Sequence, residues 1–403
     1  MKRVISMLMV FGFLISIGAC GKDGNNPAAP PDPDGARTEA QAGDQALANG
    51  DFQDANTHYR NALAMDPANP QANVGVAVTE IYLLRSDPDV AGVIDNFGAL
   101  APPQPGLESE RAARDRRLTV RLGAAAGRSY DPLSNGRMVG RILLEGVNDP
   151  PTLSRIQQII KLKVMPKLTY AEQRLSVVET YPDFVYRIPP AVTGEPDTLE
   201  MDLGEIYALD AILNSVHGWL GVLVAYNFDT PYEGVKADSL LAPGTAFGTL
   251  HPDGAAQLSI ARGRFLQSKL QLDAMIAFIN TETDDQSDDV IPQSALTEPG
   301  FVEFLDGFNQ AHASLTQSID VEVQDHSGGP MTIHLLLKNF FTSPIEDWKT
   351  KLPEHTFDVN HEPVLAEPIT FPDPTFNGIF PDMTNADWQQ LIGPVSAGLL
   401  PAM

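Results

Sequence analysis

The sequence predicts a mainly α-helical protein that carries one small β-hairpin and ends in an irregular, Pro-rich region. Three observations support this prediction. Apolar residues recur at helical spacing in several segments of residues 37–318, whereas a strict alternation of apolar and polar residues is found at residues 319–337. Prolines then follow every few residues from Pro353 onward. At 43% hydrophobic residues, the 403-residue chain has enough apolar side chains to form a core.

Residues 1–19 are predicted to be a signal peptide. Lys2 and Arg3 form a short basic stretch before the apolar run from Val4 to Ile17. A run of this length is too short to span a bilayer and is typical of the hydrophobic part of a signal peptide. We therefore expect an exported protein.

The end of this segment, Ile17-Gly18-Ala19-Cys20, resembles the lipobox of bacterial lipoproteins. The resemblance implies cleavage before Cys20 and attachment of lipid to its side chain, which anchors the chain to a membrane. It also implies a place in the cell envelope, at the outer membrane, because Gly21 rather than Asp follows the cysteine. The alternative is an ordinary signal peptide that ends in a cysteine by chance. Since Cys20 is the only cysteine, a disulfide within the chain is excluded.

Residues 20–36 are predicted to be a disordered tether, since they consist mostly of Gly, Pro, Asn and Asp and have almost nothing to bury. At roughly 3.1 Å per residue, such a tether reaches about 50 Å. The chain is also acidic, with 52 Asp and Glu against 27 Lys and Arg and a net charge of −25. This charge argues against nucleic acid as a partner.

Residues 37–100 are predicted to form helical repeats. Within them, residues 38–71 resemble one tetratricopeptide repeat, a pair of antiparallel helices with small, aromatic and helix-ending residues at fixed positions. Here those positions hold Gly43, Ala46, Ala55, Tyr59, Ala62 and Pro67. Glu39 and Ala42 depart from the pattern, which has Trp and Leu there. The resemblance implies a groove that binds protein segments. Alternatively, these helices only pack against the rest of the protein.

Residues 101–318 are predicted to form a helical body that covers the open face of the repeat, because one repeat cannot bury its own face. Helices are expected at about residues 152–164, 169–180, 202–228 and 255–280, with another starting near 297 and one at about 70–85 ahead of the body. Thr169 and Glu172 have the spacing of a capping box. The segment 202–228 is apolar on most faces, which predicts a buried central helix.

One face of the helix expected at residues 202–228 carries a polar stripe. Tyr207, Asp210, Asn214 and His217 are spaced 3, 4 and 3 residues apart, so they line a single side of the helix. Polar groups on a buried helix have to be satisfied by hydrogen bonds. The stripe therefore predicts either a polar network that joins neighbouring helices or one wall of a small-molecule pocket.

An acidic segment follows the helix expected at residues 255–280, with Glu282, Asp284, Asp285, Asp288 and Asp289 within eight residues. Carboxylate oxygens in a flexible loop are suitable Ca²⁺ ligands. The spacing is not that of an EF-hand, and no glycine lies at the turn. We expect a solvated loop here, with Ca²⁺ binding as the alternative.

Residues 319–403 are predicted to form the β-hairpin and an irregular C-terminal lid. Apolar and polar residues alternate on both sides of Gly328-Gly329, which predicts two antiparallel strands joined by a turn. Further on, Phe-Pro-Asp occurs at residues 371–373 and again at 380–382, and Trp388 is expected to anchor a last short helix. We expect this region to cover the helical body, with a recognition surface as the alternative.

The sequence contains no catalytic motif that we could identify. It lacks a G-x-S-x-G elbow, an H-E-x-x-H pair, a phosphate-binding glycine loop and a dinucleotide-binding glycine pattern. We therefore expect a protein that is not an enzyme and needs no cofactor. The anchor, the tether and the repeat predict an envelope lipoprotein that binds a partner protein or works in an envelope assembly. The alternative is an accessory protein of a transport system that holds a solute or lipid between its helices.

Overall fold

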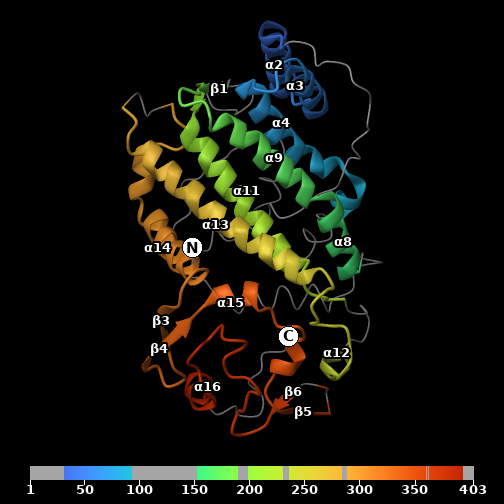
Figure 1. Ribbon diagram of the computed structural model, residues 1–403, viewed down its shortest axis with the longest axis vertical. Helices are drawn as coiled ribbons and strands as arrows, with labels where there is room; N and C mark the ends of the chain where they lie inside the picture. Colours follow the sequence, from blue (N-terminus) through green and yellow to red (C-terminus); the bar gives the residue numbers. More distant parts are fainter. Residues whose placement is uncertain are drawn as a thin grey trace, which may run out of the picture.

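A computed structural model of the chain describes residues 31–92, 152–188, 198–229, 236–283, 288–359, 361 and 363–393. The predicted mainly α-helical fold is confirmed. Figure 1 shows an elongated molecule with two helices at one end, a diagonal helical body in the middle and the C-terminal region at the other end. The predicted signal peptide, Cys20 and most of the tether lie outside the described residues.

The chain enters the fold through three helices, α2 (Pro33–Ala48), α3 (Phe52–Met65) and α4 (Pro70–Leu83). The start of α2 corrects the predicted tether, which extended to residue 36. The Asp32 side chain accepts a hydrogen bond from the Gly35 amide at 3.0 Å, and Pro33 occupies the first turn, where its missing N–H costs nothing. The composition of this stretch predicts disorder, but its last residues form a capped helix start.

Tyr59 fixes the packing of these three helices. Its ring lies between Gly43 of α2 and Gly75 of α4, where an added Cβ would come within 2.6 and 2.5 Å of ring atoms. The small residues Ala46, Ala55 and Ala62 are buried in the same cluster. Pro67 is exposed in the turn between α3 and α4. A glycine on either side is required because the ring and both helix backbones are in direct contact.

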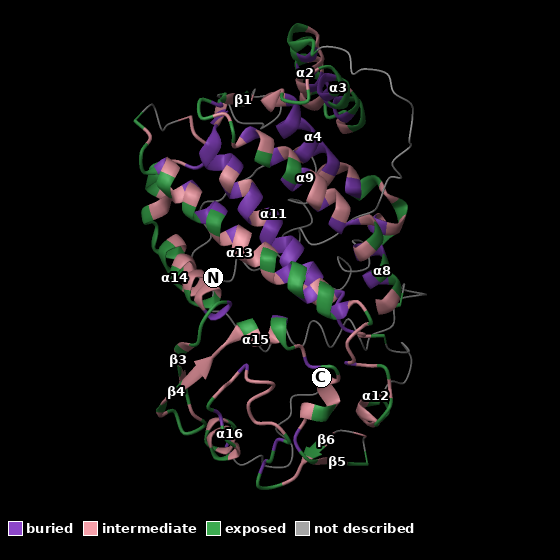
Figure 2. Cartoon of the chain, viewed as in Figure 1, coloured by how far each residue is buried: buried purple, intermediate pink, exposed green. Residues whose placement is uncertain are grey.

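The helical body continues from α4 into α8 (Leu153–Lys163), α9 (Met165–Val178), α11 (Leu203–Leu223), α13 (Gly254–Ile279) and α14 (Pro299–Ser314). Helix α9 packs against α4 on one side and α11 on the other, and α11 packs along α13. Figure 2 shows that buried residues gather on α4, α9 and α11. The core of the body therefore lies between these helices, and α11 is its central member.

Two predicted helix boundaries were wrong. Thr169 does not cap a helix, because α9 already begins at Met165 and the Thr169 hydroxyl donates back to the Met165 carbonyl at 3.0 Å. Helix α11 ends at Leu223 rather than near residue 228. Beyond that end, Tyr226 forms an antiparallel bridge with Leu250, and this pairing replaces further helical hydrogen bonds.

Helix α11 is the one helix in the described part of the chain that is long and apolar enough to cross a membrane. About two thirds of its most apolar window is buried inside the protein, as expected of a core helix. It approaches α13 closely through Gly218, which lies under the Phe265 ring, and Gly221, which lies against Ala261. Asp202 begins the helix as the N-cap of a capping box with Glu205.

Three two-stranded antiparallel sheets lie within the described residues, of which the sequence predicted one. The predicted hairpin is confirmed as β3 (Ile319–Gln324) paired with β4 (Pro330–Leu335), and Gly328 takes the positive φ of 84° that its turn needs. The other two pairs are β1 (Tyr186–Ile188) with β2 (Leu199–Met201), and β5 (His355–Phe357) with β6 (Pro363–Leu365). Their strands have only three residues each, too few for alternation to be recognised.

The C-terminal region contains short helices and loops around a cluster of aromatic rings. Helix α15 (Leu337–Thr342) joins this region to α13, where Phe341 meets Phe265 with ring centroids 5.9 Å apart. The last helix, α16 (Asn385–Ile392), carries Trp388, whose indole N–H donates to the Pro374 carbonyl at 2.8 Å. Another short helix, α12 (Ala237–Leu241), lies at the same end of the molecule. The region thus adjoins one end of the helical body (Figure 1).

Candidate functional site

The predicted polar stripe lies inside the helical body. Asp210, Asn214 and His217 are each at most 3% exposed, and Tyr207 is partly buried nearer the start of α11. The three buried side chains face α9 and α13, which supply polar partners for all of them. The site is therefore a junction of three helices rather than a stripe on one.

One layer of this junction is centred on Glu172 of α9. Its Oε1 atom lies 2.9 Å from Nδ1 of His217, and its Oε2 atom lies 2.5 Å from a guanidinium nitrogen of Arg264 on α13. The same guanidinium donates to Oδ1 of Asn214 at 3.3 Å. Glu172 is only 5% exposed, so its carboxylate depends on contacts with these two side chains rather than on water.

A second layer lies two helical turns away and is centred on Gln271 of α13. Its amide nitrogen donates to Oδ2 of Asp210 at 2.8 Å and to the two oxygens of Glu179 at 3.0 and 3.2 Å. Asn214 links the layers, because its amide nitrogen donates to Oδ1 of Asp210 at 3.1 Å. Each of the three helices thus contributes one residue to each layer, and the two members on a helix are seven residues apart.

Burial changes the acidity of the second layer. Burial, reinforced by the charges of Glu179 and Glu172, raises the pKa of Asp210 to about 8. Burial also raises the pKa of Glu179, against the hydrogen bonds from Gln271 and Asp210. Oxygens of both carboxyl groups lie within 3.2 Å of the Gln271 amide nitrogen, so two ionised carboxylates here would repel each other. Charge repulsion therefore adds to burial in favouring the protonated form.

The geometry favours a structural network over a ligand pocket at this junction. Glu172, Arg264 and Gln271 bond to the buried side chains of α11 that the sequence predicted as a possible pocket wall. A surface depression of about 280 Å³ lies elsewhere, near the start of α11, and none of the four stripe residues lines it. It is lined by residues 182–185, Asp202, Phe278 and residues 281–283.

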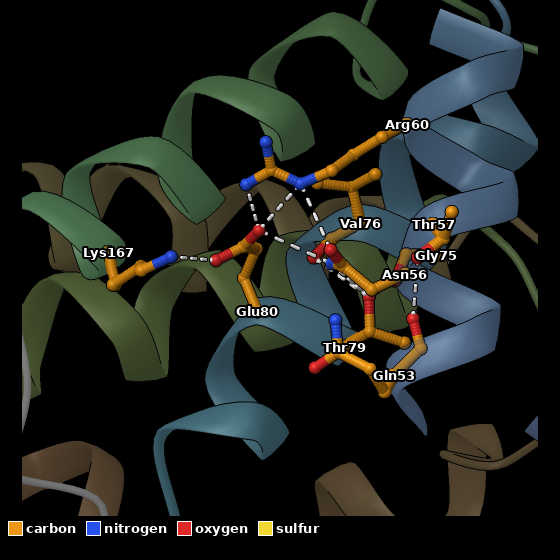
Figure 3. A network of polar contacts seen from close by, with 9 residues as sticks. All are labelled: Gln53, Asn56, Thr57, Arg60, Gly75, Val76, Thr79, Glu80 and Lys167. Atoms are coloured by element: carbon orange, nitrogen blue, oxygen red, sulfur yellow. Dashed lines mark hydrogen bonds and ion pairs between the residues drawn. The ribbon is translucent and has the colours of Figure 1, made fainter. Parts of the chain in front are cut away.

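A second buried network joins the front helices to the body (Figure 3). Glu80 of α4 is 2% exposed and forms ion pairs with Arg60 of α3 and Lys167 of α9. Asn56 of α3 donates to Glu80 at 3.3 Å and to the Thr79 hydroxyl at 2.9 Å. Burial works to raise the pKa of Glu80, but the bonds from Lys167 and Arg60 outweigh it and lower that pKa. This carboxylate therefore stays ionised.

The front helices also receive the β1 strand. The hydroxyls of Tyr59 and Tyr186 both donate to Oδ1 of Asp44 at 2.7 Å, and Gln71 donates to its other oxygen. Burial raises the pKa of Asp44 despite these bonds. Residues from α2, α3, α4 and β1 thus meet at one carboxyl group.

The acidic segment does not form a metal centre within the described residues. Asp284 and Asp285, two of the four aspartates of the Ca²⁺ alternative, lie outside them. The Asp288 carbonyl accepts from the Glu200 amide at 2.7 Å, and Asp289 forms a bridge with Glu200. Across the described ranges, no group of three or more His, Cys, Asp or Glu side chains is arranged to hold a metal ion.

The residues that the sequence analysis missed are Glu179, Arg264 and Gln271, together with the role of Glu172. A signal was present: Glu172 and Glu179, Asp210 and His217, and Arg264 and Gln271 are each separated by seven residues. Residues seven apart on a helix lie two turns apart on the same face. Three helices with matched polar pairs therefore predict two stacked polar layers, once the helices are known to be neighbours.

Comparisons with known proteins add no assignment, because no protein family, curated protein or solved structure matches the chain.

Proposed function

We propose that the protein is a non-catalytic lipoprotein of the bacterial cell envelope, held to the outer membrane by lipid on Cys20, whose helical body binds a partner protein. The observation that carries the proposal is that buried polar side chains join the helices of the body to one another. His217, Asp210 and Glu80 are buried, and each is bonded to side chains of neighbouring helices. A body whose helices are bonded to one another in this way is suited to keeping its outer surface in a fixed conformation.

The front helices are the surface that we expect to meet the partner. Helix α2 is at one end of the molecule (Figure 1) and packs on α3 and α4 through one face, the face of Ala36, Ala40 and Gly43. Its other side is open, with Gln41 and Gln45 exposed one turn apart. A partner helix could continue the stack here, as neighbouring helices do in repeat proteins.

Membrane anchoring is tested with Cys20→Ser in the source bacterium or a related host. The lipidated chain should sediment with membranes and incorporate a labelled fatty acid, whereas Cys20→Ser should incorporate none and lose membrane attachment. Stable anchoring needs more than one acyl chain, since each buried CH₂ contributes only roughly 0.8 kcal/mol. Unchanged labelling of the variant would refute the anchor.

Partner binding is tested by photo-crosslinking in intact cells. A photoreactive residue at Gln41 or Gln45 should give one discrete crosslinked species. The matched control places the same residue at Glu303, which is exposed on α14 at a distance from α2. Equal products from the α2 and α14 positions, or none from either, would contradict partner binding through the front helices.

The alternative drawn from the sequence, a solute- or lipid-binding accessory protein of a transport system, requires a ligand beside Tyr207, Asp210, Asn214 and His217. Partners from α9 and α13 take up the polar groups of the last three residues. We therefore do not favour this alternative. Native mass spectrometry of the purified protein distinguishes the two, because a retained small molecule would favour the transport role.

A further inference from the structure

Two carboxyl groups from different helices meet at one amide in the Gln271 layer. Glu179 is the C-cap residue of α9, and Asp210 lies in the middle of α11. The Gln271 amide nitrogen lies within 3.2 Å of oxygens from both groups. Each carboxyl group is therefore within about 6 Å of the other, and the Asp210 carboxyl also lies within hydrogen-bonding reach of Glu179.

The charges around this pair do not neutralise it. The acidic groups are Glu179 and Glu172 of α9 and Asp210 of α11, with the phenol of Tyr207 facing Glu179. The basic groups are Arg264 of α13 and His217 of α11. Both are within ion-pair distance of Glu172 in the other layer, and Gln271 is neutral. Among the residues that the structure describes, the pair therefore has two acids, a shared amide and no cation of its own.

We propose that Glu179 and Asp210 share a single proton, which makes the junction of α9, α11 and α13 a proton-dependent clasp. With one proton, one group is a carboxylic acid that donates to the other, and the Gln271 amide donates to both. Without it, two carboxylates, one buried and one partly buried, lie next to each other and repel. Loss of the proton loosens the C-terminal end of α9 from α11 and α13. This inference is independent of the proposed partner.

The acidity of both groups agrees with a shared proton. Burial raises the pKa of each, and that of Asp210 reaches about 8. Through this pair the folded protein then binds one more proton than the unfolded chain between about pH 4 and 8, in addition to any proton held by Glu205, whose pKa burial also raises to about 8. Its stability is fully present at the low end of that window and decreases as the pH rises towards 8. A single shared proton corresponds to a tenfold change in the unfolding constant per pH unit.

The test compares Asp210→Asn, Glu179→Gln and the double variant in urea unfolding of the full chain between pH 5 and 9. An amide can replace a carboxylic acid as a donor, so either single substitution should reduce the pH dependence by the tenfold per pH unit that the pair contributes and leave the part due to Glu205. The double variant should lose no more of the pH dependence than either single variant loses. The matched control is Asp273→Asn, an exposed carboxylate on α13, which should leave the pH dependence unchanged.

Two outcomes would overturn the clasp. If each single substitution removes its own part of the pH dependence and the double variant removes twice as much, the two acids titrate independently. If none of the three changes the pH dependence, the pair is ionised in the folded protein. Infrared spectroscopy gives a second readout that does not depend on unfolding. A protonated carboxylic acid band should persist at pH 7 and be absent from Asp210→Asn, and its absence from the unmodified protein would refute the proposal.

Discussion

In the helical body, charged side chains lie between the helices: Glu80, Glu172 and Asp210 are each at most 5% exposed. In the C-terminal region, residues 319–393, no charged side chain among the described residues is buried to that degree. Figure 2 shows the same contrast, with buried residues concentrated in the body and partly exposed ones in the C-terminal region. There, aromatic rings pack against one another, and the ring centroid of Trp388 lies 5.2–5.6 Å from those of Phe371, Phe376 and Phe380.

The structure shifts the pKa of Asp210 in the body and the pKa of two aspartates in the C-terminal region in opposite directions. In the body, burial raises the pKa of Asp210 to about 8. In the C-terminal region, partial burial opposes but does not outweigh the bonds from Lys351 and the Asn377 and Thr375 amides, which lower the pKa of Asp373. Hydrogen bonds to Ser327 similarly lower the pKa of Asp325 to about 2. Burial therefore favours the protonated form of Asp210, whereas hydrogen bonds favour the ionised forms of Asp373 and Asp325 in the C-terminal turns.

The largest effect is expected from removal of an ion-pair partner in the body. Glu172→Ala leaves Arg264 facing a cavity and His217 without its carboxylate partner, so we expect a loss of about 3–5 kcal/mol of unfolding free energy. Urea unfolding measures it. Glu303→Ala, at an exposed position of α14, should change the unfolding free energy by less than about 0.5 kcal/mol. A loss below about 1 kcal/mol for Glu172→Ala would show that the network does not stabilise the body.

A somewhat smaller and more local effect is expected from the aromatic cluster. Trp388→Ala removes three ring contacts and the bond to the Pro374 carbonyl, at a cost of about 3 kcal/mol. We expect limited proteolysis to cut residues 319–393 faster while the body stays resistant. Trp219→Ala is the matched control, because this body tryptophan is 59% exposed and should cost less than about 1 kcal/mol. Equal acceleration of cleavage in both regions would contradict the division.

The two regions should respond to pH in opposite directions. The raised pKa of Asp210 means that the body loses stability as the pH rises from about 4 to 8, by about 1.4 kcal/mol per pH unit for one proton. The lowered pKa of Asp373 means that its contribution is present above its unfolded value and is lost as the pH falls through the folded one. Urea unfolding at pH 5–8 measures the first effect.

Tryptophan fluorescence between pH 5 and 2 measures the second effect, because Trp348 and Trp388 lie in the aromatic cluster. Asp373→Asn should weaken the C-terminal region at pH 5 and flatten its acid transition. An acid transition that is unchanged in this variant would show that Asp373 is not its source.

Local signals in the sequence predicted most of the helices and the β3–β4 hairpin. The helix expected at residues 255–280 became Gly254–Ile279, and Trp388 anchors the last short helix as expected. One of the errors, the end of helix α11, occurred where a neighbour in space decides the structure. Helix α11 ends at Leu223 because the following chain pairs with residues near Leu250, which no local pattern encodes.

The sequence predicted the residues of the candidate site that lie on α11 but not their partners on the neighbouring helices. The stripe on α11 was visible because its residues share one helix, and its spacing placed Asp210, Asn214 and His217 on one face. Their partners Glu172 and Gln271 lie 45 and 61 residues from the residues that they bind. Pairings at such separations depend on which helices become neighbours. The choice between a network and a pocket could therefore be made only from the structure.

The smallest effects come from the same substitution made in each region. Gly263 lies exposed on α13 with open space around its missing Cβ, and so Gly263→Ala should stabilise the body by about 0.5–1 kcal/mol. Gly328 also has open space, but its φ of 84° in the β3–β4 turn is unfavourable for alanine. Gly328→Ala should therefore destabilise by about 1 kcal/mol. Opposite signs in urea unfolding would show that backbone conformation, and not crowding, decides both outcomes, whereas a shared sign would contradict this.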